Sequence, residues 1–128
     1  MTRFIRIIIL LISVTTALSG AIQVIKPSFV LQFVGAPIDA TTSQLFATIG
    51  LFMFLFGAMM IHALYNDENN RVAVIWSGLQ KFGASAAVFT GILNGTFVPL
   101  AAGVALFDLV SALLFFYYLK TLNTDAVG

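Results

Sequence analysis

The sequence contains no cysteine, and only 9% of its 128 residues are charged. The absence of cysteine excludes disulfides, thiolate catalysis, iron–sulfur clusters and structural cysteine–zinc sites. Intrinsic disorder is excluded as well, because it requires low hydrophobicity together with high net charge. Six Lys and Arg residues stand against five Asp and Glu residues. The chain therefore has no basic patch that could hold nucleic acid.

Histidine is equally scarce, since His62 is the single one in the chain. A single histidine excludes bis-histidine haem ligation within one chain. We interpret His62 as a hydrogen-bonding residue at the membrane interface; the weaker alternative is a metal or haem ligand. No nucleophile–base arrangement, phosphate-binding loop or His-rich motif occurs in the sequence. We therefore expect no catalytic residues, no bound metal and no cofactor, which favours a protein that is not an enzyme.

Hydrophobic residues make up 60% of the chain, against about 45–50% in a soluble domain. The mean hydropathy is +1.05. A chain of this length cannot bury so much apolar surface in one core. The composition therefore predicts an integral membrane protein, with the lipid bilayer as its surroundings.

Four apolar runs are long enough to cross a hydrocarbon layer about 30 Å thick, which takes about 20 helical residues. They cover residues 5–25, 45–65, 72–93 and 98–119. Thr41 and Gln44 have capping-box spacing near the start of the second run. Continuous apolar runs exclude the alternating pattern of a β-barrel. The predicted fold class is all-α, with residues 1–128 forming one transmembrane four-helix bundle with short loops.

The N-terminal run resembles a secretory signal peptide, with a small-residue site at Ala17-Leu18-Ser19. Its apolar stretch continues to Ile25, so we interpret it as the first transmembrane helix. Residues 28–33 are too short to span and either form a helical turn or two along the interface or a plain loop.

The distribution of positive charge predicts an orientation, because Lys and Arg favour the cytoplasmic flanks of transmembrane helices. One side carries Arg3, Arg6, Arg71 and Lys120, and the other side carries Lys26. The tyrosines and the tryptophan agree, since they lie near the same side: Tyr65, Trp76, Tyr117 and Tyr118. We therefore expect both termini in the cytoplasm.

Two charged residues fall inside the predicted spans. Asp108 lies near the middle of the fourth run, where a charge costs about 2.5–3.5 kcal/mol on insertion scales. Lys81 lies in the third run. If these runs form antiparallel helices joined by a turn near Thr96, Lys81 is level with about position 111, one helical turn from Asp108. The two side chains are therefore predicted to be within reach of each other.

This predicted pair has several interpretations. It is either a structural pair that sets the helix register or an ionisable site that binds a proton or ligand. Asp108 could instead be unpaired or protonated, and Lys81 could extend outward to the interface. Ser77 and Ser85 lie on the same polar stripe as Lys81.

Small residues at helical spacing predict close helix contacts. In the fourth run, one stripe holds Ala101, Ala105, Asp108 and Ala112, and in the third run a stripe opposite Lys81 holds Gly83, Ala87 and Gly91. We therefore expect the third helix to be packed on two sides. Gly50 and Gly57 are interpreted as packing positions in the second helix.

The chain resembles the small four-helix bacterial membrane proteins of the DoxX-like kind. The residues behind this resemblance are Lys26-Pro27, Gly35-Ala36-Pro37, Gly50, Gly57 and Asp108. An arginine that is frequent in those families has no counterpart here, where Ala47-Thr48 and Asn66-Asp67-Glu68 stand in its places. The resemblance implies a bacterial inner-membrane protein that serves a redox or stress-related partner. The small multidrug resistance transporters are similar in length alone. Their first helix carries a membrane-embedded glutamate, whereas this chain has no acidic residue before Asp39.

We expect a non-catalytic accessory or assembly subunit of a membrane complex, with a membrane-protein partner, or a homo-oligomer. The alternative is a small-molecule or proton-coupled transporter, or an isomerase-like bundle, that uses Asp108 and Lys81. A third possibility is a scaffold that senses the membrane through residues 29–33.

Overall fold

The computed structural model describes residues 2–66 and 70–127, and over these ranges it contains helices and no strand. For residue 2 and residues 123–127 it describes the backbone alone. The elements are α1 (Thr2–Ile25), α2 (Pro27–Val34), α3 (Ala40–Leu64), α4 (Arg71–Leu93), the 3₁₀ turn η1 (Pro99–Ala101) and α5 (Ala102–Val127). Within the described residues, four helices are long and apolar enough to cross a membrane: α1, α3, α4, and α5 together with η1. The predicted all-helical architecture is confirmed.

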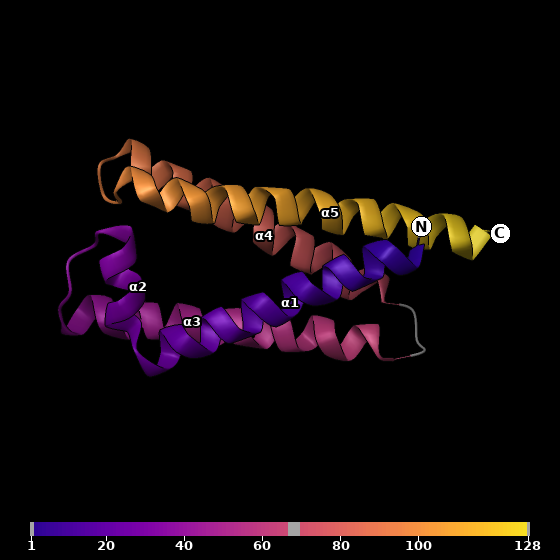
Figure 1. Cartoon of the computed structure of the whole chain (residues 1–128), viewed down its shortest axis with the longest axis horizontal. Helices are drawn as coiled ribbons and strands as arrows, with labels where there is room; N and C mark the ends of the chain where they lie inside the picture. Colours follow the sequence, from indigo (N-terminus) through magenta and orange to yellow (C-terminus); the bar gives the residue numbers. More distant parts are fainter. Residues whose placement is uncertain (1, 67–69, 128) are drawn as a thin grey trace.

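The four long helices run alternately in opposite directions (Figure 1). The start of α1, the end of α3, the start of α4 and the end of α5 lie at one end, called here the termini end. The short helix α2 and the turn between α4 and α5 lie at the other end, called here the α2 end. Because the chain traverses the bundle four times, it returns to the end at which it began.

The bundle consists of two helix pairs, since α1 packs mainly on α3 and α4 packs mainly on α5. Glycines bring α1 and α3 together. A Cβ atom on Gly57 would lie 2.7 Å from the Ser13 carbonyl oxygen, and one on Gly20 would lie 2.5 Å from the Gly50 carbonyl oxygen. Real Cβ atoms do not approach other atoms so closely, so the two backbones touch at these positions. Gly50 and Gly57 are packing positions in this structure.

Small side chains perform the same role in the second pair. Ala101, Ala105 and Ala112 are fully buried along one stripe of η1 and α5. The Ser85 hydroxyl on α4 donates a 2.8 Å hydrogen bond to the Ala105 carbonyl oxygen. A side chain can reach the backbone of a neighbouring helix in this way because the alanines let the helices approach closely.

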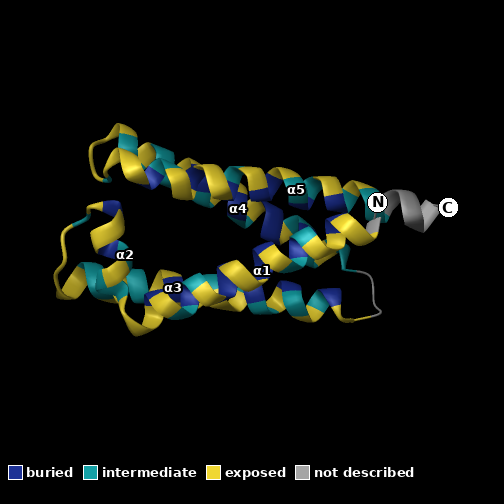
Figure 2. Ribbon diagram, in the orientation of Figure 1, coloured by how far each residue is buried: buried dark blue, intermediate teal, exposed yellow. Residues whose placement is uncertain are grey.

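Polar side chains are buried between the helices, and many large apolar side chains are exposed on the outside. Buried residues gather where the helices meet, and the outer faces are exposed (Figure 2). Among the residues whose side chains are described, the buried polar or charged ones are Ser13, Thr16, Gln23, Ser77, Lys81, Ser85, Asp108 and Ser111. Large apolar side chains such as Phe52, Leu106 and Leu113 are exposed on the outside. Such a surface is unfavourable in water.

The α2 end differs in detail from the sequence-based expectations. Residues 28–33 belong to the helix α2, and the loop alternative is wrong. Leu31 and Val34 are buried while Phe29 and Phe33 are exposed. The Val98 amide donates a 2.9 Å hydrogen bond to the Val34 carbonyl oxygen. This bond attaches α2 to the segment that leads into η1.

The start of α3 requires a correction. The helix begins at Ala40, and its N-cap is Asp39 rather than Thr41. An Asp39 carboxylate oxygen accepts a 2.8 Å hydrogen bond from the Thr42 amide, and the Thr42 hydroxyl accepts a 3.0 Å bond from the Asp39 amide. The capping box therefore joins Asp39 and Thr42, not Thr41 and Gln44. An aspartate at the N-cap satisfies amides that have no partner inside the helix.

One aromatic residue is also placed differently from the expectation. Tyr118, predicted to lie in an interfacial belt, is buried in the hydrophobic cluster with Ile5, Ile9 and Phe115. Tyr65, Trp76 and Tyr117 are exposed. Hydropathy does not show which face of a helix a tyrosine near the end of an apolar run occupies. Here Tyr118 faces the interior, where it packs in one cluster with Ile5 and Ile9 of α1.

Candidate functional site

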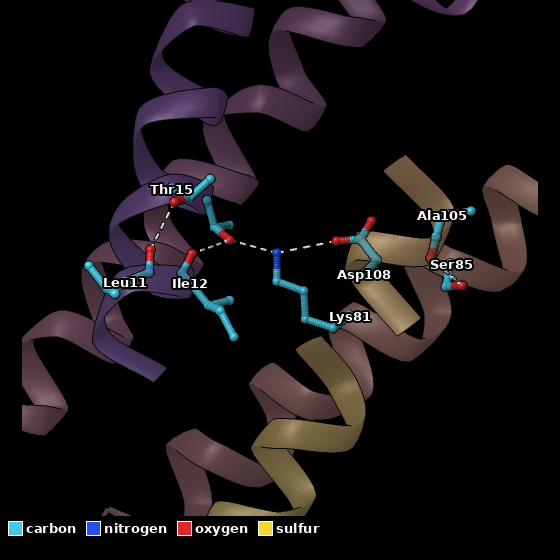
Figure 3. A network of polar contacts seen from close by, with 8 residues as sticks. Leu11, Ile12, Thr15, Lys81, Ser85, Ala105 and Asp108 are labelled. Atoms are coloured by element: carbon cyan, nitrogen blue, oxygen red, sulfur yellow. Dashed lines mark hydrogen bonds and ion pairs between the residues drawn. The ribbon is translucent and has the colours of Figure 1, made fainter. Parts of the chain in front are cut away.

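Lys81 lies at the centre of a buried polar cluster that joins three helices. Its side chain extends inward from α4 and is 4% exposed. The ammonium nitrogen Nζ is 3.3 Å from Oδ1 of Asp108 on α5 and 2.6 Å from Oγ1 of Thr16 on α1. Figure 3 shows the Lys81 side chain between α1 and Asp108. The structure thus brings together the two charged residues singled out from the sequence.

The position of Asp108 follows from the short connection between α4 and α5. Antiparallel helices joined by a short turn place residues at similar distances from the turn at similar depth. Asp108 shares its stripe of α5 with Ala105 and Ala112, which are buried. The stripe faces α4, so the carboxylate meets the ammonium of Lys81 in the interior of the bundle.

Thr16 is the member of the cluster that sequence reasoning missed. Its hydroxyl donates a 2.9 Å hydrogen bond to the Ile12 carbonyl oxygen of its own helix. The hydroxyl oxygen retains lone pairs that accept the hydrogen bond from Lys81. A signal was present in the sequence, because Ser13, Thr16, Gly20 and Gln23 have the three- to four-residue spacing of one helix face.

The Lys81 side chain also faces an aromatic ring. The ammonium lies 5.3 Å from the centre of the Phe107 ring, within the range of a cation–π interaction. Lys81 therefore has an anion, a hydroxyl and an aromatic face around one nitrogen. Two sequence-based alternatives are wrong in this structure: Lys81 does not extend outward, and Asp108 is not unpaired.

A small cavity adjoins the cluster. Its volume is about 10 Å³, close to the minimum that a single water molecule requires. Its lining includes the polar or charged residues Ser13, Thr16, Ser77, Gln80 and Lys81. Among the described residues, the Ser77 hydroxyl is a buried side-chain group without a hydrogen-bond partner. The cavity has no room for an organic substrate.

Two of the three residues in the second small-residue stripe of α4, Gly83 and Ala87, are not packed inside the chain, which corrects the expectation of a helix covered on two sides. A Cβ atom added to Gly83 would have no atom within 4 Å outside its own helix. Ala87 is exposed, and Gly91 is covered by the Phe97 ring. The stripe with Ala101, Ala105 and Ala112 packs inside the bundle, whereas Gly83 and Ala87 face outward.

His62 lies apart from the buried cluster, at the termini end of α3, and is exposed. It lines a cavity of about 350 Å³ with Met59, Asn66 and Trp76 among its neighbours. Within the described residues, no three His, Asp or Glu side chains are grouped to hold a metal ion. Asp67 and Glu68, named above in the comparison with DoxX-like proteins, lie outside the described residues.

The arrangement of the buried cluster permits two chemical roles. Lys81, Asp108 and Thr16 hold the two helix pairs together, and the same groups can exchange a proton between an ammonium and a carboxylate. No protein-family model matches the sequence, and neither a curated protein nor a solved structure matches it.

Proposed function

We propose that this chain is a small membrane protein that acts as a non-catalytic accessory or assembly subunit, either with a membrane-protein partner or as a homo-oligomer. Four helices have the length and hydropathy to span a bilayer. The outward large apolar side chains and the inward polar ones suit a hydrocarbon environment, in which buried polar groups must find partners within the protein.

The observation that carries the proposal is the outward small-residue stripe of α4. Gly50, Gly57 and Gly20 are all used in close contacts between α1 and α3, whereas Gly83 and Ala87 lie open on the surface. In a membrane, small residues of this spacing allow another helix to pack closely. The cavity beside Lys81, by contrast, has a volume of about 10 Å³, which is too small for a substrate.

The proposed location is the bacterial inner membrane, with both termini in the cytoplasm. The resemblance to DoxX-like proteins supports the bacterial membrane. The orientation rests on positive charge, because Arg3, Arg6, Arg71 and Lys120 are at the termini end and Lys26 is at the α2 end. Positively charged flanks favour the cytoplasmic side.

Cross-linking tests the α4 stripe directly, because the chain has no native cysteine. In native membranes, Ala87→Cys should give cross-linked products with a partner protein or with a second copy. Val104→Cys is the matched control, since Val104 is exposed on α5 at a similar distance from the turn near Thr96. Equal cross-linking at both positions would contradict a specific interface on α4.

Native mass spectrometry of the gently solubilised protein supplies the second measurement. A heteromeric or homo-oligomeric species is expected for the wild type, and Gly83→Leu should reduce it because a large side chain keeps the partner helix away. A wild-type protein that is purely monomeric, together with no cross-link at position 87, would overturn the proposal.

A second candidate function is proton transfer through the buried cluster. The supporting observation is a carboxylate, an ammonium and the unpartnered Ser77 hydroxyl gathered in the interior. A proton needs no large cavity, so the volume of about 10 Å³ is no obstacle. Ionisable residues inside membrane helices commonly belong to proton or ion pathways.

Purified protein in vesicles that contain a pH-sensitive dye tests this second function. The wild type should dissipate an imposed pH gradient, and Asp108→Asn should abolish the flux while the helical content stays unchanged. Asp39→Asn is the control, because this exposed residue is remote from the cluster and Asn also serves as an N-cap. Wild-type vesicles as tight as protein-free vesicles would exclude the function.

A further inference from the structure

A cationic groove lies at the termini end of the first helix pair. It is formed by the start of α1 and the end of α3 and has a volume of about 230 Å³. Its lining consists of Arg3, Arg6, Ile7, Leu10, Leu64 and Tyr65. This groove is separate from the cavity beside Lys81, with which it shares no lining residue.

Among the described residues, the charged side chains that line the groove are all positive. Arg3 and Arg6 contribute two guanidinium groups, and no carboxylate is among the lining residues. Arg6 donates a hydrogen bond to the Leu64 carbonyl oxygen, which holds its side chain across the end of α3. A guanidinium has five N–H donors, so Arg6 can bind a further acceptor while it keeps this bond. The groove therefore suits an anion with several oxygen atoms.

The lining also changes from polar to apolar along α1. Leu10 follows Arg3 by about 10 Å along the helix axis, and Ile7 lies between them. On the α3 side the groove is lined by the buried Leu64 and the exposed Tyr65. A ligand that fits this gradient has an anionic head and an apolar tail, with the head near the end of the helices and the tail toward the middle of the bundle.

We propose that the groove binds an anionic phospholipid, with the phosphodiester on the two arginines and the first part of an acyl chain against Ile7 and Leu10. Arginine binds phosphate through paired, charge-assisted hydrogen bonds. A zwitterionic phospholipid carries an additional cation, which the two arginines disfavour. The site does not depend on the proposed assembly role, because it is formed within one chain.

Native mass spectrometry with defined lipids measures this preference. The delipidated protein is mixed with equal amounts of phosphatidylglycerol and phosphatidylcholine that have the same acyl chains. The wild type should retain phosphatidylglycerol preferentially. Each arginine removed, by Arg3→Gln or Arg6→Gln, should lower that preference about fivefold, as expected for a basic residue near an anionic headgroup.

Two further variants separate a specific site from general charge. Lys26→Gln removes one positive charge at the α2 end and should leave the preference unchanged. Arg3→Lys keeps the positive charge and should retain most of the phosphatidylglycerol binding. Arg6→Gln loses the hydrogen bond to Leu64, so circular dichroism is used to verify that this variant remains folded. Equal retention of the two lipids by the wild type would overturn the proposal, as would a loss in Lys26→Gln as large as that in Arg3→Gln.

Discussion

The ammonium group of Lys81 on α4 donates a 2.6 Å hydrogen bond to the hydroxyl of Thr16 on α1. The contact crosses between the two helix pairs, because α1 packs mainly on α3 and α4 packs mainly on α5. The same nitrogen forms the ion pair with Asp108. Lys81 therefore holds its own pair together and also attaches that pair to the other one.

Removal of the Thr16 hydroxyl should weaken the contact between the pairs. Thr16→Val keeps the shape of the side chain and should lower the unfolding free energy by about 1 kcal/mol, in the range of hydrogen bonds between membrane helices. Thr15→Val is the matched control, since Thr15 is exposed and its hydroxyl bonds to Leu11 of its own helix. Denaturation with SDS from mild detergent, followed by circular dichroism, measures both. Equal losses would show that the bond to Lys81 contributes nothing.

The ion pair should show strong coupling between its members. Lys81→Met or Asp108→Leu alone leaves a buried charge without a partner and should cost about 3–5 kcal/mol of stability. The double variant removes both charges and should regain most of that loss. The same SDS titration yields the coupling energy, and a double variant whose loss equals the sum of the single losses would contradict a buried pair.

Substitution by alanine should change the stability of the protein in opposite directions at Gly57 and at Gly83. A Cβ atom on Gly57 meets backbone atoms of α1 at 2.7 Å, so Gly57→Ala must separate α1 from α3 and should cost about 1–3 kcal/mol. Gly83 has open space around it, and Gly83→Ala should stabilise the monomeric protein by about 0.5–1 kcal/mol because glycine is unfavourable within a helix. Thermal denaturation of monomer in detergent compares the two. A destabilising Gly83→Ala would show that α4 is covered at this position.

The cap of α3 provides a test outside the bundle interior. Asp39→Ala removes the side chain that accepts the Thr42 amide and should cost about 1 kcal/mol. Thr41→Ala changes the residue that sequence spacing favoured as the cap, and its effect should be within about 0.5 kcal/mol. Hydrogen exchange of the first α3 amides should rise for Asp39→Ala alone. The reverse pattern would restore Thr41 as the capping residue.

The sequence by itself determined the helical architecture and the meeting of Lys81 with Asp108. Apolar runs of this length specify membrane-length helices, and a short turn between α4 and α5 leaves little freedom in their relative depth. Helix ends were less well specified. Hydropathy predicted apolar runs at residues 45–65 and 98–119, whereas α3 begins at Ala40 and α5 continues to Val127. A helix can extend beyond its apolar run into polar sequence because its backbone hydrogen bonds are satisfied there as well.

Only the tertiary structure decided which faces are covered. Thr16 is 65 positions from Lys81 in the sequence, and no local rule relates the rotation of α1 to that of α4. The small residues Gly83 and Ala87 showed that a helix could approach α4 but not whether one does. The polar stripe with Lys81 faces the interior, where Asp108 and Thr16 supply the partners that a buried charge requires, and this arrangement turns Gly83 and Ala87 outward.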